Sequence, residues 1–236
     1  MSDYYPVYLN LKGKPCVIIG GGRVAEGKIS KLRDAGAKIT VISPQVTPAI
    51  RSAAQDGQLE WCEKEYQDGD LQQAFLAIAA TNVRGVNRQI FEEAERQNVL
   101  LNVVDDAPLC TFIAPSIVER GPVTLAISTA GASPALARKL RESLTNDPVL
   151  DWADLAGVMS QVRSELKKQG AVVDPQRWQC CLSSQLLDLA RSGAEEEAGA
   201  KLLSSLLDGK TPNLCPRVDR CLPQGCSSKP QDRSNR

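Results

Sequence analysis

The first half of the chain alternates short apolar runs with segments whose apolar residues recur at helical spacing. Five runs rich in β-branched and other apolar residues predict strands. They lie at residues 14–19, 38–42, 59–62, 75–79 and 100–104. Between them, patterns such as Ala25, Ile29 and Leu32, or Val86, Ile90 and Ala94, predict helices. Strands that alternate with helices in this way predict an α/β fold with a doubly wound parallel sheet through about residue 112.

The pattern changes after residue 112. Apolar runs at 111–114 and 123–129 predict two strands, joined by a polar link at 119–121. Ser133 and Pro134 predict the start of a helix, because serine is a good N-cap and proline fits the first turn. Residues 113–147 thus form a small α+β unit. Two strands and one helix are too thin to bury their own apolar faces, so we expect a dimerisation unit.

The remainder of the chain reads as a helical domain over 148–210 and a tail over 211–236. One helix is predicted from an apolar row and a second from a leucine-rich row. The first row is Leu150, Leu155, Val158, Val162 and Leu166, and the second is Leu182, Leu186, Leu187 and Leu189. The tail is rich in Pro, Ser, Arg and Gln, which predicts disorder.

A glycine-rich turn follows the first predicted strand and leads into the first predicted helix. Its pattern is Gly20-x-Gly22-x-x-Ala25. Glycine at such a turn lets backbone N–H groups approach a pyrophosphate, and the helix N-terminus adds partial positive charge. The pattern therefore predicts a Rossmann-type, NAD-binding domain over residues 1–112. The alternative is a tight strand-to-helix turn that binds no ligand.

Ligands of such sheets bind at the carboxyl ends of the strands. The loops there span 20–24, 43–45, 80–82 and 104–106, so we expect them to converge on one cleft and count Thr81 among the cofactor-binding residues. Ser43 stands where an acidic residue often selects NAD by binding the ribose hydroxyls. Serine does not repel a 2′-phosphate, and Arg23 or Lys28 are candidates to bind one, so NADP stays open as an alternative.

Composition narrows the chemistry and the partners. Basic and acidic residues balance at 28 each, which argues against nucleic acid or an anionic membrane as partner. The sequence begins without a signal-peptide pattern and holds no long apolar run, so we expect a cytoplasmic protein with reduced cysteines. It contains no histidine, which removes the commonest general base and metal ligand.

Two adjacent carboxylates follow the fifth predicted strand, in the run Asn102-Val103-Val104-Asp105-Asp106. At the ligand-binding edge of the sheet, such a carboxylate is a candidate general base. The alternative is that Asp105 or Asp106 only caps a turn.

Several motifs in order resemble one family. The chain carries Gly20-Gly21-Gly22-Arg23-Val24-Ala25, Asn102-Val103-Val104-Asp105, Phe112-Ile113-Ala114-Pro115-Ser116 and the run Ser128-Thr129-Ala130-Gly131-Ala132-Ser133-Pro134. In this order they resemble the precorrin-2 dehydrogenase and sirohydrochlorin ferrochelatase module of the siroheme synthase family, in a stand-alone form. The resemblance implies NAD-dependent dehydrogenation of precorrin-2 to sirohydrochlorin and, in bifunctional members, insertion of Fe²⁺ as a substrate to give siroheme. It also implies a homodimer.

The resemblance further implies roles for individual residues. Asp105 matches the family's catalytic aspartate, which would act as general base and hold Fe²⁺ transiently. The cofactor contacts would fall on Arg23, Val24, Pro44 and Gln45.

The substrate of that family is a polycarboxylate, so the chain must concentrate cations and hydrogen-bond donors at its site. The candidate substrate-binding residues are Arg138 and Lys139, with the hydroxyls of Ser128, Thr129 and Ser133. The alternatives are a solvated helix face for the cations and helix capping for the hydroxyls. Two other functions stay open: a non-catalytic Rossmann NAD(H) sensor, and a dehydrogenase of another polyanionic substrate.

Overall fold

The structure is a computed structural model that describes residues 4–208. Within this part, the chain divides into two compact units. The first takes in the described part of residues 1–115 together with 128–134, and the second takes in 116–127 together with the described residues after 134. The predicted tail at 211–236 lies outside the described residues.

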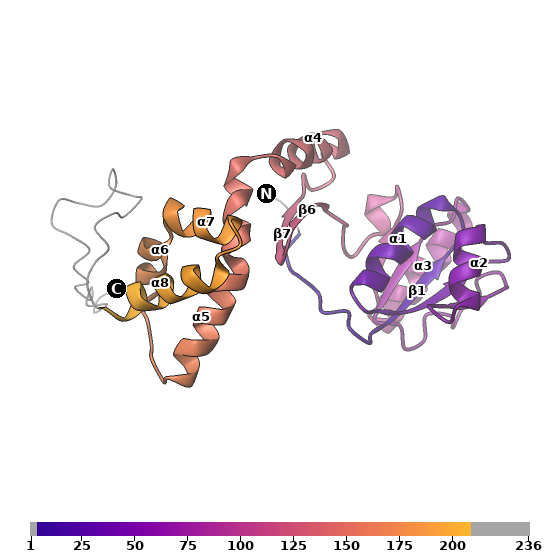
Figure 1. Ribbon diagram of the computed structural model, residues 1–236. Coiled ribbons are helices and arrows are strands. Elements are labelled where there is room, and N and C mark those ends of the chain that lie inside the picture. Colours follow the sequence, from indigo (N-terminus) through magenta and orange to yellow (C-terminus); the bar gives the residue numbers. More distant parts are fainter. Residues whose placement is uncertain (1–3, 209–236) are drawn as a thin grey trace, which may run out of the picture. The chain divides into compact units, whose positions relative to one another are not determined.

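A five-stranded parallel sheet forms the centre of the first unit (Figure 1). Its strand order is β3-β2-β1-β4-β5, and every pair of neighbours is parallel. The strands are β1 (Pro15–Ile19), β2 (Lys38–Ile42), β3 (Glu60–Cys62), β4 (Leu76–Ala79) and β5 (Leu100–Val103). This confirms the predicted doubly wound sheet. Because β1 lies between β2 and β4, the order reverses there, and such a point is where ligands bind in open parallel sheets.

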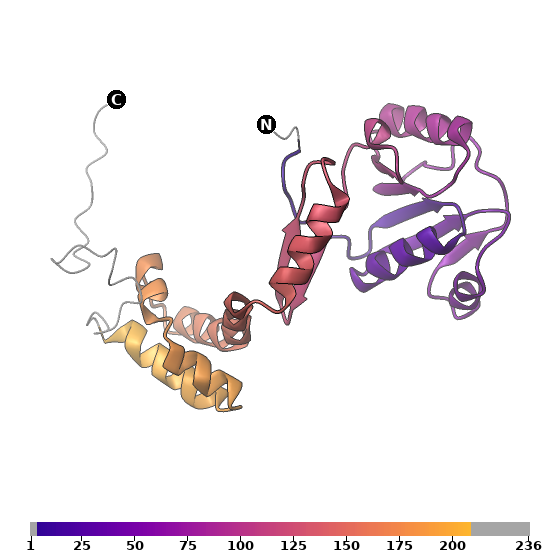
Figure 2. The ribbon, with the colours of Figure 1, turned by 90° about the horizontal axis from the view of Figure 1, so that it is seen from above.

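Helices cover both faces of this sheet, which explains why its central strands are mainly apolar. Figure 2 shows α3 (Arg84–Gln97) on one face, with α1 (Arg23–Asp34) and α2 (Pro48–Gln55) on the other. Successive residues of β1 point to opposite faces. Cys16 and Ile18 pack in the core beside α1, whereas Val17 and Ile19 pack in the core beside α3.

The buried carboxylate of Glu93 links α3 to the loop that precedes β4. Its Oε1 accepts hydrogen bonds from the backbone N–H of Leu71 at 3.0 Å and from Gln97 Nε2 at 2.8 Å. Its Oε2 accepts a short hydrogen bond from the Tyr66 hydroxyl. Burial, and then this bond, raise the pKa of Tyr66 well above its usual range. Glu93 is fully buried, so these donors explain how its carboxylate is accommodated.

The second unit begins with an antiparallel hairpin of β6 (Ser116–Arg120) and β7 (Val123–Ile127). The prediction of a strand at 111–114 was therefore wrong. Of the predicted link at 119–121, Glu119 and Arg120 belong to β6, whereas Gly121 lies in the turn between the strands. After the short helix η1 (Ala107–Leu109), the backbone N–H groups of Thr111 and Phe112 both donate to the carbonyl oxygen of Leu101, at 2.8 and 3.3 Å. Two donors on one carbonyl do not form a strand ladder. Pro115 lacks an N–H donor, so the regular pairing begins only after it.

Helix α4 (Pro134–Thr145) starts at the predicted proline. Of its residues, Ala137 is buried, whereas two leucines remain accessible: Leu136 is 51% and Leu140 is 41% exposed.

Five further helices follow in the part of the second unit that the structure describes. They are η2 (Pro148–Leu155), α5 (Ala156–Lys168), α6 (Pro175–Cys181), α7 (Ser184–Arg191) and α8 (Glu195–Leu207). The apolar row predicted as one helix divides between η2, a tighter 3₁₀ helix with Leu150 and Leu155, and α5. Leu182 lies outside α7, because Ser183 is extended and caps that helix by accepting a hydrogen bond from the Leu186 N–H at 3.3 Å.

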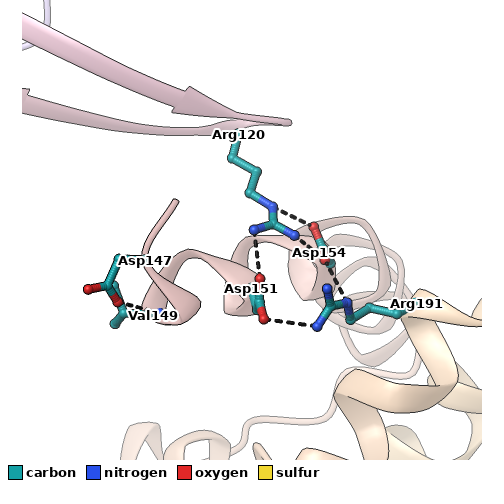
Figure 3. A network of polar contacts seen from close by, with 6 residues as sticks. All are labelled: Arg120, Asp147, Val149, Asp151, Asp154 and Arg191. Atoms are coloured by element: carbon teal, nitrogen blue, oxygen red, sulfur yellow. Dashed lines mark hydrogen bonds and ion pairs between the residues drawn. The ribbon is translucent and has the colours of Figure 1, made fainter. Parts of the chain in front are cut away.

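An ion-pair network joins the hairpin to the helices of the second unit (Figure 3). Arg120 on β6 donates from Nη1 to Asp151 at 2.7 Å, and from Nε and Nη2 to the two carboxylate oxygens of Asp154 at 3.0 and 2.8 Å. Arg191 on α7 donates to Asp151 at 2.9 Å. Hydrogen bonds to Asp154 and Asp151 raise the pKa of Arg120 above its usual value.

None of the helices in the described part of the chain is long and apolar enough to span a membrane.

Candidate active site

The turn after β1 lies directly against the end of β4. Gly20 has φ +110°, a conformation that favours glycine. A Cβ atom there would lie 2.4 Å from the carbonyl oxygen of Ala80. Glycine is therefore required for the β1 and β4 ends to approach this closely.

The second glycine of the turn lies against the loop after β2. A Cβ atom on Gly21 would lie 2.1 Å from the carbonyl oxygen of Gln45, and the Gly21 carbonyl accepts a hydrogen bond from the Thr47 N–H at 2.9 Å. Reasoning from the G-x-G-x-x-A spacing singled out Gly20 and Gly22 and missed Gly21. The available signal was the run of three consecutive glycines.

The third glycine faces open space at the start of α1. A Cβ atom on Gly22 would meet nothing within 4 Å, and Gly22 is the N-cap of α1 without a side-chain capping hydrogen bond. Arg23 and Val24, both exposed, form the first turn behind it. A helix N-terminus without a cap side chain, reached through glycine, fits the pyrophosphate of a nicotinamide dinucleotide.

Ser43 is nearly buried at the end of β2, with 8% exposure. Its hydroxyl donates to the carbonyl oxygen of Gln45 at 2.7 Å, and its own carbonyl accepts from Trp61 Nε1 at 2.9 Å. The hydroxyl thus shapes the loop in which Pro44 and Gln45 are exposed. Binding of the cofactor by these three residues remains a prediction.

A cleft of about 690 Å³ opens at the carboxyl ends of β4 and β5. It brings together three of the predicted site residues: Val24 from α1, Thr81 after β4 and Asp105 after β5. Its full lining is Val24, Ala80, Thr81, Asn82, Arg84, Asn87, Arg88, Val104, Asp105, Asp106 and Leu109. The first turn of α1, which directly follows the glycine turn, and the carboxylate predicted to act as base therefore contribute to one cavity.

Asp105 adopts a left-handed backbone conformation, with φ +60°, in the turn after β5. Few residues other than glycine adopt it without cost, and such conformations are common at functional sites. The turn is held by Cys110, whose Sγ accepts from the Val103 N–H at 3.1 Å and lies 3.2 Å from the Val103 carbonyl and 3.3 Å from the Asp106 carbonyl. These contacts on both sides of Asp105 fix the turn that presents its carboxylate.

Lys28 of α1 lies in the electrostatic surroundings of this turn. Burial, and then repulsion by Lys31, lower the pKa of Lys28, while attraction by Asp105 and Cys110 opposes that shift. The charges of Lys28 and Asp105 therefore lie close enough to attract each other.

Three residues at the start of α3 were missed by the sequence reasoning. Arg84, Asn87 and Arg88 line the cleft on α3. Asn87 Nδ2 donates to the carbonyl oxygen of Thr81 at 3.2 Å, and Thr81 Oγ1 accepts from the Val83 N–H at 3.1 Å. The signal was two arginines four residues apart at the start of the helix that follows β4, a pattern that surface helices also show.

The predicted substrate-binding residues are not among those that line this cleft. In the loop before α4, Ser128 Oγ accepts from the Ala130 N–H at 3.0 Å, and Thr129 Oγ1 bonds both backbone groups of Ser133 at 3.1 Å. On α4, Arg138 pairs with Glu142 at 2.8 Å and Lys139 is exposed. Binding of substrate by these five residues remains a prediction.

Within the described residues, no three side chains of His, Cys, Asp or Glu come together as a metal site. The cleft presents two neighbouring carboxylates, Asp105 and Asp106.

Comparison with known proteins agrees with this arrangement. Residues 7–116 match a family described as "Putative NAD(P)-binding", and residues 120–146 match the family "Sirohaem biosynthesis protein central". The chain is 35% identical over 206 residues to siroheme synthase 1 of Serratia proteamaculans (strain 568), which covers 86% of this chain and 43% of the relative. It is 38% identical over 206 residues to siroheme synthase 2 of Yersinia pestis (strain Pestoides F), covering 86% of this chain and 44% of that relative. The chain thus spans less than half the length of these curated relatives.

Among solved structures, the chain is similar to SirC, a precorrin-2 dehydrogenase. The TM-score is 0.67 at 28% identity, and the match covers 84% of this chain and 98% of SirC. Sequence motifs, both family matches and the fold therefore agree: this chain belongs to the siroheme synthase and precorrin-2 dehydrogenase family.

Proposed function

We propose that this protein oxidises precorrin-2 to sirohydrochlorin with a nicotinamide dinucleotide as hydride acceptor, in siroheme biosynthesis, with Asp105 as general base. The observation that carries the proposal is the common cleft. Val24 at the start of α1, Thr81 after β4 and Asp105 after β5 all line it. Likeness to SirC over nearly its whole length supports the same reaction.

The chemistry needs two acceptors, one for a hydride and one for a proton. When bound, the nicotinamide ring accepts the hydride. The chain supplies the proton acceptor: Asp105 takes up the proton at a carboxylate oxygen, beside the positive charge of Lys28. The N-terminus of α1, approached through Gly20, Gly21 and Gly22, would hold the pyrophosphate.

Insertion of Fe²⁺ into sirohydrochlorin is the second activity that we propose for the same cleft. It requires removal of two pyrrole protons while oxygen ligands hold the incoming metal weakly. Asp105 and Asp106, adjacent in the lining, supply a base and hard oxygen ligands. The metal is a substrate of this proposed step.

Asp105→Asn is the sharpest test of the proton acceptor. Asparagine tolerates the left-handed backbone conformation, so the turn should persist while the base is lost. We expect the rate of sirohydrochlorin formation from precorrin-2 and NAD⁺ to fall at least about 100-fold, with NADH binding unchanged.

The matched control is Asp106→Asn, which removes the same charge from the neighbouring residue. Equal loss in both variants would indicate a general electrostatic effect, and unchanged turnover in Asp105→Asn would exclude Asp105 as the base. A parent protein that binds NADH but does not convert precorrin-2 would support the alternative of a non-catalytic NAD(H) sensor. Titrations with NADH and NADPH decide between the two cofactors.

We also propose that the protein is a homodimer through residues 113–147. The support is a thin hairpin followed by a helix with a 41%-exposed leucine, Leu140. Light scattering on the parent and on Leu140→Glu tests it: we expect a dimer that dissociates in the variant. A monomeric parent would refute the assembly.

A further inference from the structure

The start of helix α3 lies beside the cleft and carries two positively charged side chains, although a helix N-terminus favours negative charge. Arg84 is its first residue, and Arg88 lies one turn later on the same side. Like charges at this spacing repel, and a cation at a helix N-terminus opposes the helix dipole. The first turn contains no acidic residue, and the N-cap, Val83, forms no side-chain capping hydrogen bond. The start of α3 therefore combines unpaired N–H groups with two guanidinium groups.

Neither arginine forms a strong ion pair with another described residue. Arg84 forms no ion pair within the described part of the chain. Arg88 Nε lies 3.9 Å from Glu92 Oε1, with side chains 79% and 60% exposed, and such pairs contribute little. Both guanidinium groups are thus available to a ligand in the cleft that they line.

Asn87, between them in sequence, gives an independent indication of a ligand. Its side chain is 6% exposed and lines the same cleft. Nδ2 donates to the Thr81 carbonyl at 3.2 Å, but Oδ1, although buried, accepts no hydrogen bond from any described residue. A buried acceptor without a donor costs free energy, so this oxygen is suited to an N–H or O–H group of a bound molecule.

We propose that Arg84, Asn87 and Arg88 form a subsite for the polycarboxylate substrate, in which the two arginines bind its carboxylates and Asn87 Oδ1 accepts one of its N–H or O–H groups. This inference rests on the proposed function and assigns substrate contacts to α3, in addition to those predicted for α4.

The sheet order argues against the cofactor phosphates as the anions in question. The pyrophosphate is assigned to the N-terminus of α1, and a 2′-phosphate would lie at the end of β2. Since β2 and β4 flank β1 on opposite sides, α3, which follows β4, begins on the side away from β2. Anions at the start of α3 must then come from the second ligand of the cleft.

Equilibrium titrations with two separate probes test the assignment. The substrate probe is uroporphyrin, a stable porphyrin with acetate and propionate side chains, and the cofactor probe is NADH. We expect Arg84→Gln and Arg88→Gln each to weaken uroporphyrin binding roughly tenfold, and the double variant roughly 100-fold, with NADH affinity within about twofold of the parent. Raising the salt concentration should weaken uroporphyrin binding less in the double variant than in the parent.

Arg96→Gln is the matched control, because it removes the same charge near the other end of α3, where Arg96 pairs with Asp68. It should leave uroporphyrin affinity unchanged. Parent-like affinity in the double arginine variant, or an equal loss in Arg96→Gln, would overturn the subsite.

Asn87→Leu removes the buried acceptor at similar size. We expect weaker uroporphyrin binding in this variant. Its melting temperature should stay near that of the parent, because removal of the buried oxygen that lacks a donor offsets the loss of the hydrogen bond from Nδ2 to the Thr81 carbonyl. A loss confined to NADH would overturn the assignment to substrate, as would unchanged binding of both probes.

Failure of this subsite is distinguishable from failure of the proposed function. If the parent converts precorrin-2 while the double arginine variant still binds uroporphyrin normally, only the subsite is wrong. If the parent binds both probes, with the expected loss in the variants, but does not convert precorrin-2, the subsite stands and the proposed reaction is wrong.

Discussion

Gly21 and Gln45 are in direct backbone contact, so that a Cβ atom on Gly21 would lie 2.1 Å from the Gln45 carbonyl oxygen. The contact holds the turn after β1 against the loop after β2. Because the obstacle is backbone, a side chain cannot be accommodated by a simple rotamer change. The Gly21→Ala substitution should therefore destabilise the protein by about 2 kcal/mol and weaken NADH binding.

Gly27→Ala is its natural control. Gly27 lies within α1, and a Cβ atom there meets nothing within 4 Å. Alanine should stabilise the helix by up to about 1 kcal/mol. Urea unfolding of both variants checks the pair, and a Gly21→Ala protein as stable as the parent would show that the loop moves freely.

Gly22→Ala separates ligand binding from stability. Its backbone, with φ −84°, suits alanine, and the added methyl group would enter open space at the N-terminus of α1. We expect stability within about 1 kcal/mol of the parent, but NADH affinity at least about tenfold lower, because the methyl group occupies the approach to the helix N–H groups. Calorimetric titration with NADH measures this. Normal affinity would place the pyrophosphate elsewhere.

Glu93 should be a major determinant of stability, although it takes no part in the proposed reaction. Replacement by alanine leaves the Leu71 N–H without its acceptor, removes the partner of Tyr66 and opens a cavity under α3. We expect a loss of about 3 kcal/mol, and a smaller loss for Glu93→Gln, which keeps the shape and one acceptor oxygen. The free energy of unfolding from urea titration is the measurement. Similar losses for both variants would contradict the role of the acceptor oxygens.

Cys16 makes stability depend on pH in the alkaline range. Burial in β1 raises the pKa of Cys16 from its ordinary value of 9.0 to about 11. The unfolded chain therefore releases this proton at lower pH than the folded protein. The contribution is complete below about pH 9 and is lost as the pH rises towards 11.

Cys16→Val removes that titration while keeping an apolar side chain suited to a strand. Between pH 8 and pH 10.5 the parent should lose roughly 2 kcal/mol more of its free energy of unfolding than the variant. Parallel pH curves for the two proteins would show that the thiol titrates alike in both states.

The sheet was predictable because its physical signal is local. A strand buried on both faces is mainly apolar, and β1, β2, β4 and β5 are, with Asn102 the buried polar residue of β5. The hairpin was misplaced because 111–114 is as apolar as a strand, yet its N–H groups are taken by Leu101. Only the tertiary pairing distinguishes a segment that runs beside β5 from one that forms its own ladder.

For the site, the glycine turn and Asp105 were identifiable because each carries a pattern in neighbouring residues. The contribution of α3 was not identifiable from the sequence. Arg84, Asn87 and Arg88 line the cleft only because the strand order brings the start of that helix to it. The left-handed backbone of Asp105 is likewise invisible in the sequence, because aspartate adopts it only where the surrounding turn imposes it.

The thiol of Cys110 makes the turn of Asp105 sensitive to chemistry that does not touch the carboxylate. Burial raises the pKa of Cys110, so that near neutral pH the sulfur keeps its hydrogen and can donate it to a carbonyl of the turn. An alkylating reagent or a peroxide that reached this sulfur would break the hydrogen bonds between Cys110 and the backbone of the turn. Asp105 would then no longer be held in its position in the cleft. Loss of turnover after thiol modification would then result from displacement of Asp105. It would not by itself indicate that a cysteine takes part in the reaction.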